Sequence, residues 1–172
     1  MEVRFRQTAG MRGIAVEVAS GGVSAIEGTG RCEISLAHVG ESGDIGQARS
    51  VWNLDPAQFD LIITAQQSHL DALLAQLPEV HDRAFPLVRV AALAQQFGGL
   101  AEADDLREFV KAIRQADQET PKPERSKYAI FNPLDIPDPH VLGTNLHGMA
   151  AEMITESIET LINGGPAITD PG

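Results

Sequence analysis

The sequence is short of cysteine, of aromatic residues and of basic charge. It contains one cysteine and 5% aromatic residues, and it has 13 lysines and arginines but 24 aspartates and glutamates. A single cysteine, Cys32, excludes an internal disulfide framework. The formal net charge of -11 disfavours binding to a phosphate backbone, which requires a surface dense in Lys and Arg. We therefore expect no nucleic-acid partner.

Long apolar runs are also absent. No run reaches the roughly 20 residues that a membrane-spanning helix needs, so we expect no membrane partner. The amino end, Met1 to Arg6, lacks the apolar core of a secretion signal. Together with the lone cysteine, these features predict a cytoplasmic protein, while the oligomeric state stays open.

The length and the hydrophobic content of the chain suffice for one domain. A chain of 172 residues with 43% hydrophobic content can bury a sizeable core, and it shows no internal repeat. We expect a single domain over residues 1–165 and a disordered tail over residues 166–172. Residues 118–127, rich in proline and charge, predict a solvated loop within that domain.

Strand-like and helix-like segments alternate along the chain. Runs of β-branched and apolar residues predict strands at 14–19, 60–64 and 84–87. Apolar residues at three- and four-residue spacings predict helices between and after these strands. The expected helices cover residues 1–11, a short segment at 47–52, and then 68–77, 88–97, 104–116 and about 145–163. This alternation predicts an α/β fold, a mostly parallel sheet covered by helices on both faces.

Asp138 is the most informative polar residue. It precedes Pro139 and a long amphipathic helix, and proline restricts the backbone of the residue before it. A carboxyl held so stiffly can be aimed at a pocket, although an Asp-Pro pair that merely caps a turn is the competing interpretation. Asp135 is the nearest alternative acid.

The order of these segments resembles the low-molecular-weight protein tyrosine phosphatases, whose relatives include thioredoxin-coupled arsenate reductases of the same fold. The resemblance runs nearly end to end. It is carried by Val16–Gly22 as a strand and turn, Phe59–Thr64 as the next strand, Leu70–Leu77 as a helix, Ala84–Arg89 as the following strand, and Asp138-Pro139 as the loop before the closing helix.

The resemblance implies a three-layer α/β sandwich around a four-stranded, mostly parallel sheet. It implies hydrolysis of phosphomonoesters through a cysteinyl-phosphate, with a phosphorylated protein or a small aryl phosphate as substrate and with no cofactor or metal. Asp138 would be the catalytic general acid. His140 would take the place of an aromatic residue at the mouth of the substrate pocket, which makes it a candidate substrate-binding residue.

The nucleophile loop of this family is missing from the sequence. That loop reads Cys, five residues, Arg and then Ser or Thr, whereas the five residues after Cys32 are followed by His38 in place of the arginine, and no helix visibly begins after Cys32. We interpret Cys32 as an inert thiol. Met1 resembles a residue just inside the helix that follows the loop. We therefore expect the family's first strand and its phosphate loop to be encoded in frame ahead of Met1. In the sheet of this family, that first strand lies between the second and third strands.

Two other functions stay open. The chain is compatible with a non-catalytic binding or regulatory homologue of the same fold, which would have to fold without the missing segment. A thiol-dependent arsenate reductase is the weaker alternative, because it would need further cysteines to resolve its intermediate.

Overall fold

The computed structural model describes residues 1–30, 32–38, 40, 47–121, 132 and 134–165. The tail expected at 166–172 and most of the loop expected at 118–127 lie outside these residues. Within the described residues no helix combines the length and the apolar character needed to cross a membrane.

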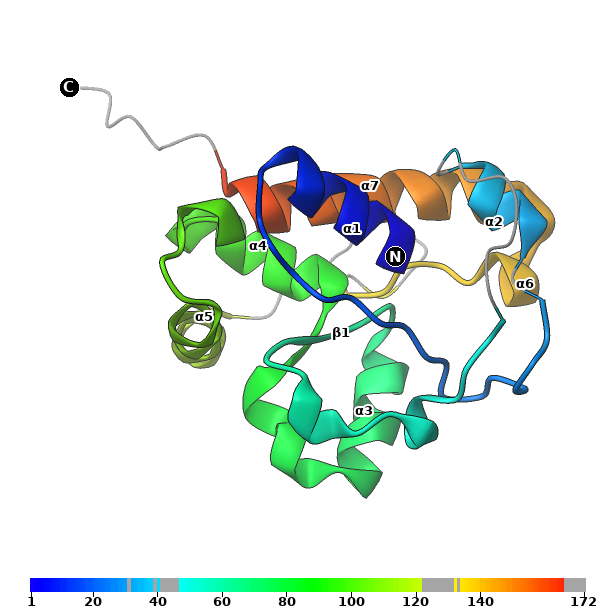
Figure 1. The fold of residues 1–172 in the computed structure, drawn as a ribbon, viewed down its shortest axis with the longest axis horizontal. Coiled ribbons are helices and arrows are strands. Elements are labelled where there is room, and N and C mark those ends of the chain that lie inside the picture. Colours follow the sequence, from blue (N-terminus) through cyan, green and yellow to red (C-terminus); the bar gives the residue numbers. More distant parts are fainter. Residues whose placement is uncertain (31, 39, 41–46, 122–131, 133, 166–172) are drawn as a thin grey trace.

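The chain has a mixed α/β fold in which helices predominate (Figure 1). Its α-helices and strands are α1 (Glu2–Met11), α2 (Glu33–Ala37), β1 (Ile62–Thr64), α3 (Gln67–Gln76), β2 (Ala84–Pro86), α4 (Leu87–Phe97), α5 (Leu106–Glu119), α6 (Pro139–Leu142) and α7 (His147–Asn163) among the residues described. Single turns of 3-10 helix join them at Val51–Asn53, Pro56–Gln58, Leu100–Glu102 and Thr144–Leu146, and a longer one covers Pro78–Arg83.

The two strands form a parallel pair. Ile62 lies opposite Ala84, and Thr64 lies opposite Pro86. Helix α3 connects the strands and contacts both of them, as a crossover between parallel strands must. The strands expected at 60–64 and 84–87 are thereby confirmed in position, with shorter bounds.

Helices lie on both sides of this pair. Figure 1 shows α1, α4 and α7 on one side of β1 and α3 on the other. Helix α4 is largely buried from Leu87 to Ala94 and exposed over its last three residues. It packs along α7, so apolar side chains of these two helices make most of the main core. A second, smaller core surrounds Leu70 and Leu73 of α3.

Local signals explain the helix ends. Asp105 caps α5, because its side chain accepts hydrogen bonds from the backbone N–H groups of Arg107 and Glu108. Helix α7 ends at Gly164, whose φ of 71° is readily adopted by glycine. The helices expected at 1–11, 68–77, 88–97, 104–116 and 145–163 are confirmed, each within a few residues.

Residues 14–19 do not form the expected strand. Within the described part of the chain, the backbone of residues 15–19 makes one hydrogen bond, from the Arg6 guanidinium to the Val18 carbonyl. The segment is nevertheless extended, and Ile14 and Val16 pack on the main core. Its composition therefore suits a strand, but a ladder requires a neighbouring strand and none of the described residues supplies one.

Two further expectations need correction. A short helix, α2, begins directly after Cys32, where the sequence gave no sign of a helix. The helix expected at 47–52 is a 3-10 turn at Val51–Asn53, capped by the Ser50 side chain. Both elements are too short for a periodic apolar pattern to reveal them.

Candidate functional site

The loop that carries Asp138 is fastened to the carboxyl end of β1. The Ile136 N–H donates to the Ala65 carbonyl at 2.8 Å, and the Gln66 side chain donates to the Ile136 carbonyl at 3.2 Å. The Asp135 carboxylate accepts a hydrogen bond from the Gln67 N–H at 2.7 Å. In open α/β sheets, ligands bind beyond the carboxyl ends of the strands, so this loop occupies the place where a site is expected.

Asp138 combines a structural role with access to a cavity. Its Oδ1 atom accepts a hydrogen bond from the His140 N–H at 2.8 Å and so caps α6, with Pro139 in the first helical position. The residue is half-buried and lines a cavity of about 270 Å³. Asp135, the alternative acid, does not line this cavity, because its carboxylate is turned to Gln67.

Distant parts of the chain meet at this cavity, which we call the acid cavity. Besides Asp138, its wall includes Met1 directly before α1, Gln66 directly before α3, and three histidines. These histidines are His69, His140 and His147. These histidines show no ligand spacing along the sequence, but the fold places all three at the wall of the cavity that Asp138 lines.

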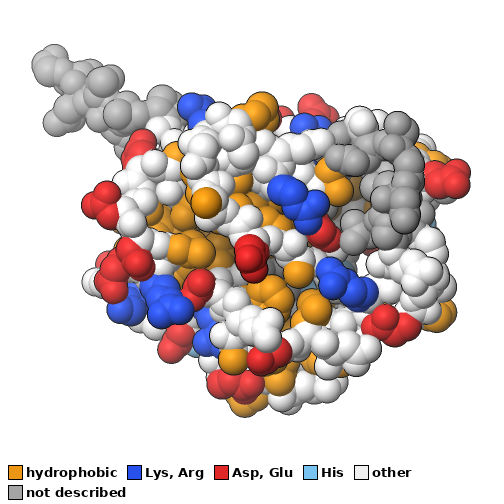
Figure 2. All heavy atoms as spheres, viewed as in Figure 1, with side chains coloured by type: hydrophobic (Ala, Val, Ile, Leu, Met, Phe, Trp, Pro, Cys, Tyr) orange, Lys and Arg blue, Asp and Glu red, His pale blue; other side chains and the backbone are white. Residues whose placement is uncertain are grey.

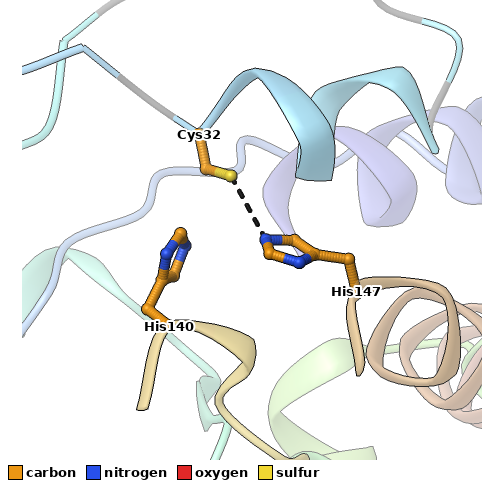
Figure 3. A group of neighbouring side chains, drawn as sticks. All are labelled: Cys32, His140 and His147. Carbon is orange, nitrogen blue, oxygen red and sulfur yellow. Dashed lines mark hydrogen bonds between the residues drawn. The ribbon is translucent and has the colours of Figure 1, made fainter. Parts of the chain in front are cut away.

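Two of these histidines form a cluster with Cys32 (Figure 3). Cys32 Sγ lies 3.4 Å from His147 Nε2, and the rings of His140 and His147 meet edge to face with centroids 5.2 Å apart. One ligand atom from each of the three residues lies within 4.8 Å of the others. Cys32 stands just ahead of α2, His140 in α6 and His147 at the start of α7, so three separate elements bring them together.

The surroundings of Cys32 favour its thiolate. Burial raises the pKa of the Cys32 thiol, but hydrogen bonds from the Ser35 side chain and backbone, from His147 and from the Ile34 backbone together lower it to about 7. A thiol with this pKa is ionised to a large extent at neutral pH, which favours a reactive Cys32 over the inert thiol expected from the sequence. No spacing in the sequence could have revealed this, because Cys32 and His147 are 115 residues apart.

A second, larger cavity of about 470 Å³ lies between the extended segment 15–21 and residues 58–63, the last two of which belong to β1. We call it the strand groove. Leu87, Leu106 and Ile158 contribute apolar side chains from one side, and Leu73 of α3 and Leu77, which caps that helix, contribute from the other. Figure 2 shows apolar side chains gathered in the middle of this face, among acidic and basic ones.

Both rims of the strand groove carry unpaired backbone. The order of the described sheet is β1–β2, so one edge of β1 has no partner strand among the described residues. The opposite rim, residues 15–19, has the single backbone hydrogen bond noted above. Unpaired N–H and C=O groups beside an apolar floor form a template for another strand.

Comparisons of this chain with protein-family models, with curated proteins and with solved structures find no match. They assign no family to the chain. Its chemistry must therefore be inferred from the acid cavity, the strand groove and the cluster of Cys32, His140 and His147.

Proposed function

We propose that this chain is the body of a phosphomonoester hydrolase of the low-molecular-weight tyrosine phosphatase type, with Asp138 as its general acid. The nucleophile loop would come from a segment on the amino side of Met1. The observation that carries this proposal is the position of Met1, which lines both the strand groove and the acid cavity. A strand that ran along the groove and continued into α1 would pass directly by Asp138.

The strand groove supports the first part of this proposal. A strand placed between segment 15–19 and β1 would pair with both edges and cover the apolar floor. The sheet would then have four strands, with α1, α4 and α7 on one face and α3 on the other. This is the three-layer sandwich that the resemblance to the phosphatases implies.

The acid cavity supports the second part. A phosphate loop that ended at Met1 would place its backbone N–H groups at the start of α1, where a helix attracts anions. Its cysteine thiolate would attack phosphorus while Asp138 gives a proton to the departing phenolate oxygen. Water would then attack the cysteinyl-phosphate, and the Asp138 carboxylate would take the proton from that water as free phosphate forms.

His140 is the candidate for substrate contact. Its side chain is exposed and lines the acid cavity two residues beyond Asp138. An imidazole ring at this position can stack on the aryl group of a phosphate ester, although it offers less apolar surface than a phenyl ring. We propose a small aryl phosphate or a phosphorylated protein as the substrate class.

The test begins with the codons that precede Met1. The proposal expects an open reading frame that encodes a strand and then Cys-x5-Arg-Ser, and an in-frame stop immediately upstream would contradict it. The extended protein should hydrolyse p-nitrophenyl phosphate, whereas residues 1–172 alone should not. Cys32→Ser is the matched control, because the extended protein should keep its rate when this second thiol is removed.

Asp138→Asn tests the role of the acid. Asparagine can still accept the hydrogen bond from the His140 N–H, so α6 should keep its cap. The variant of the extended protein should lose about 10²- to 10⁴-fold in rate on poor leaving groups and much less on good ones. Asp135→Asn, outside the cavity, should leave this dependence unchanged. If the extended protein folds cooperatively but lacks activity, the chain is a non-catalytic binding homologue instead.

A further inference from the structure

Cys32 and His147 have no role in the phosphatase chemistry proposed above, and together with His140 they form a cluster whose three side chains are metal ligands by type. We propose that these three residues bind a zinc ion. This inference goes beyond the proposed hydrolase activity and does not depend on it, since all three ligands belong to the described chain.

The spacing of two ligand atoms already suits zinc. Zn–S bonds of about 2.3 Å and Zn–N bonds of about 2.0–2.1 Å place tetrahedral neighbours roughly 3.3–3.6 Å apart. Cys32 Sγ and His147 Nε2 are 3.4 Å apart. A zinc ion can therefore bridge these two atoms with little movement of either residue.

The third ligand needs only a small adjustment. The three candidate ligand atoms lie within 4.8 Å of one another, so His140 must approach its partners by about 1 Å to reach tetrahedral spacing. His140 is exposed and belongs to the four-residue helix α6, so its ring can turn without disturbing the core. His147, by contrast, is only 4% exposed, which holds its ring in place.

The donor set selects the class of metal. One thiolate and two imidazoles suit zinc, whereas magnesium and calcium prefer oxygen ligands. On binding, the Cys32 thiol loses its proton to solvent and the sulfur bonds to the metal, which leaves a site charge of +1 in a chain of formal net charge -11. Electrostatics therefore favour the bound cation.

Three protein ligands leave one tetrahedral position for water or another small ligand. His140 and His147 both line the acid cavity, so the ion would sit at the wall of the cavity that contains Asp138. The metal would also tie α6 and the start of α7 to the segment ahead of α2. We therefore expect zinc to stabilise the folded chain.

The test is a metal titration of residues 1–172 after treatment with a chelator. Cobalt(II) serves as the spectroscopic probe, because a tetrahedral thiolate site gives a sulfur-to-cobalt charge-transfer band and intense visible bands. One equivalent should saturate both signals, zinc should displace the cobalt, and zinc should protect Cys32 from iodoacetamide. The melting temperature should rise with zinc concentration.

Substitutions identify the ligands. Cys32→Ser should abolish the charge-transfer band, and His140→Ala should weaken binding at least about 10-fold without loss of fold, because His140 is exposed. His147→Gln should weaken binding similarly. His81→Gln is the control, since His81 is an exposed histidine paired with Asp82 outside the cluster. The proposal would be overturned if no stoichiometric site were found. It would also be overturned if the Cys32→Ser and His140→Ala variants bound zinc as tightly as the unmodified chain.

These results are separable from those on the hydrolase. Metal binding is measured by absorbance and by zinc competition on the chain without any added segment. Loss of phosphatase activity in an extended protein would leave the metal titration unchanged, and a failed titration would leave the role of Asp138 intact.

Discussion

The Oδ1 atom of Asp135 accepts a hydrogen bond at 2.7 Å from the backbone N–H of Gln67, across 68 residues of sequence. Gln67 is the first residue of α3, and its N–H has no partner within the helix. The negative charge also suits the positive end of the helix. This single contact fastens the loop that carries Asp138 to the end of β1.

Asp135→Ala should therefore destabilise the fold. We expect a loss of about 1–2 kcal/mol in the free energy of unfolding, because a half-buried N–H at the helix start loses its acceptor. Urea denaturation followed by circular dichroism measures the loss. Asp104→Ala is the matched control, because it removes an aspartate carboxylate that is exposed and makes no such contact. It should change the free energy of unfolding by less than about 0.5 kcal/mol. Equal effects of the two substitutions would contradict this role.

Arg89 should be the most costly charged residue to remove. It is 4% exposed, and its guanidinium contacts the Asp117 carboxylate at 2.6 Å and the backbone carbonyls of Asp117, Thr120 and Pro121. Arg89→Met keeps the apolar stem but leaves these acceptors unsatisfied. We expect a loss of about 3–5 kcal/mol in urea denaturation.

Lys111→Met is the matched control for Arg89. Lys111 forms an ion pair with Glu108 in which both side chains are 71% exposed, so water screens the interaction. Its removal should change stability by less than about 0.5 kcal/mol. A loss at Arg89 no larger than that at Lys111 would mean that the buried network contributes nothing.

Two glycines should respond in opposite directions to alanine. A Cβ at Gly99 would stand 2.1 Å from the Gly164 nitrogen, so the chain after α4 and the end of α7 would be forced apart. We expect Gly99→Ala to lower the free energy of unfolding by about 1–3 kcal/mol. Gly10 lies in α1 with open space around it, so Gly10→Ala should raise stability by about 0.5–1 kcal/mol. Thermal melts of both variants distinguish the two effects.

The reactivity of Cys32 should depend on pH in a way that reports its surroundings. In metal-free protein, alkylation by iodoacetamide should be half-maximal near pH 7, because the pKa of the folded thiol is about 7. In urea the midpoint should rise to about 8.5, the value of a free cysteine. His147→Gln should also raise it, since His147 is one of the groups that stabilise the thiolate.

The sign of the stability effect follows from the same shift. The folded pKa lies below the unfolded value, so the thiolate stabilises the fold fully above the unfolded pKa and loses this contribution as the pH falls through about 7. An alkylation midpoint that is the same in folded and unfolded protein would contradict the environment described for Cys32.

Local chemistry was sufficient to place most helices and both strands. The apolar spacing that ends at Pro78 predicts α3, and the spacing of Phe109, Val110 and Ile113 predicts α5. Such patterns are readable because a helix buries one face and repeats every 3.6 residues, whatever the rest of the chain does. Asp138 was recognised as a candidate acid from its neighbour Pro139, because the stiffness of an Asp-Pro pair depends only on adjacent residues.

The contacts within the candidate site and the pairing of strands were decided by the packing of segments that are remote in the sequence. Cys32 and His147 lie 3.4 Å apart only because the start of α7 comes to rest beside the segment before α2. Residues 14–19 have the composition of a strand, yet they form no ladder with any residue that the structure describes, because hydrogen bonds between strands require a partner at the right distance. The sequence alone determines which side chains stand at each position and which segments favour a helix. The approach of Cys32 to His147 and the pairing of strands depend on the tertiary structure, because they join segments that are far apart in the sequence.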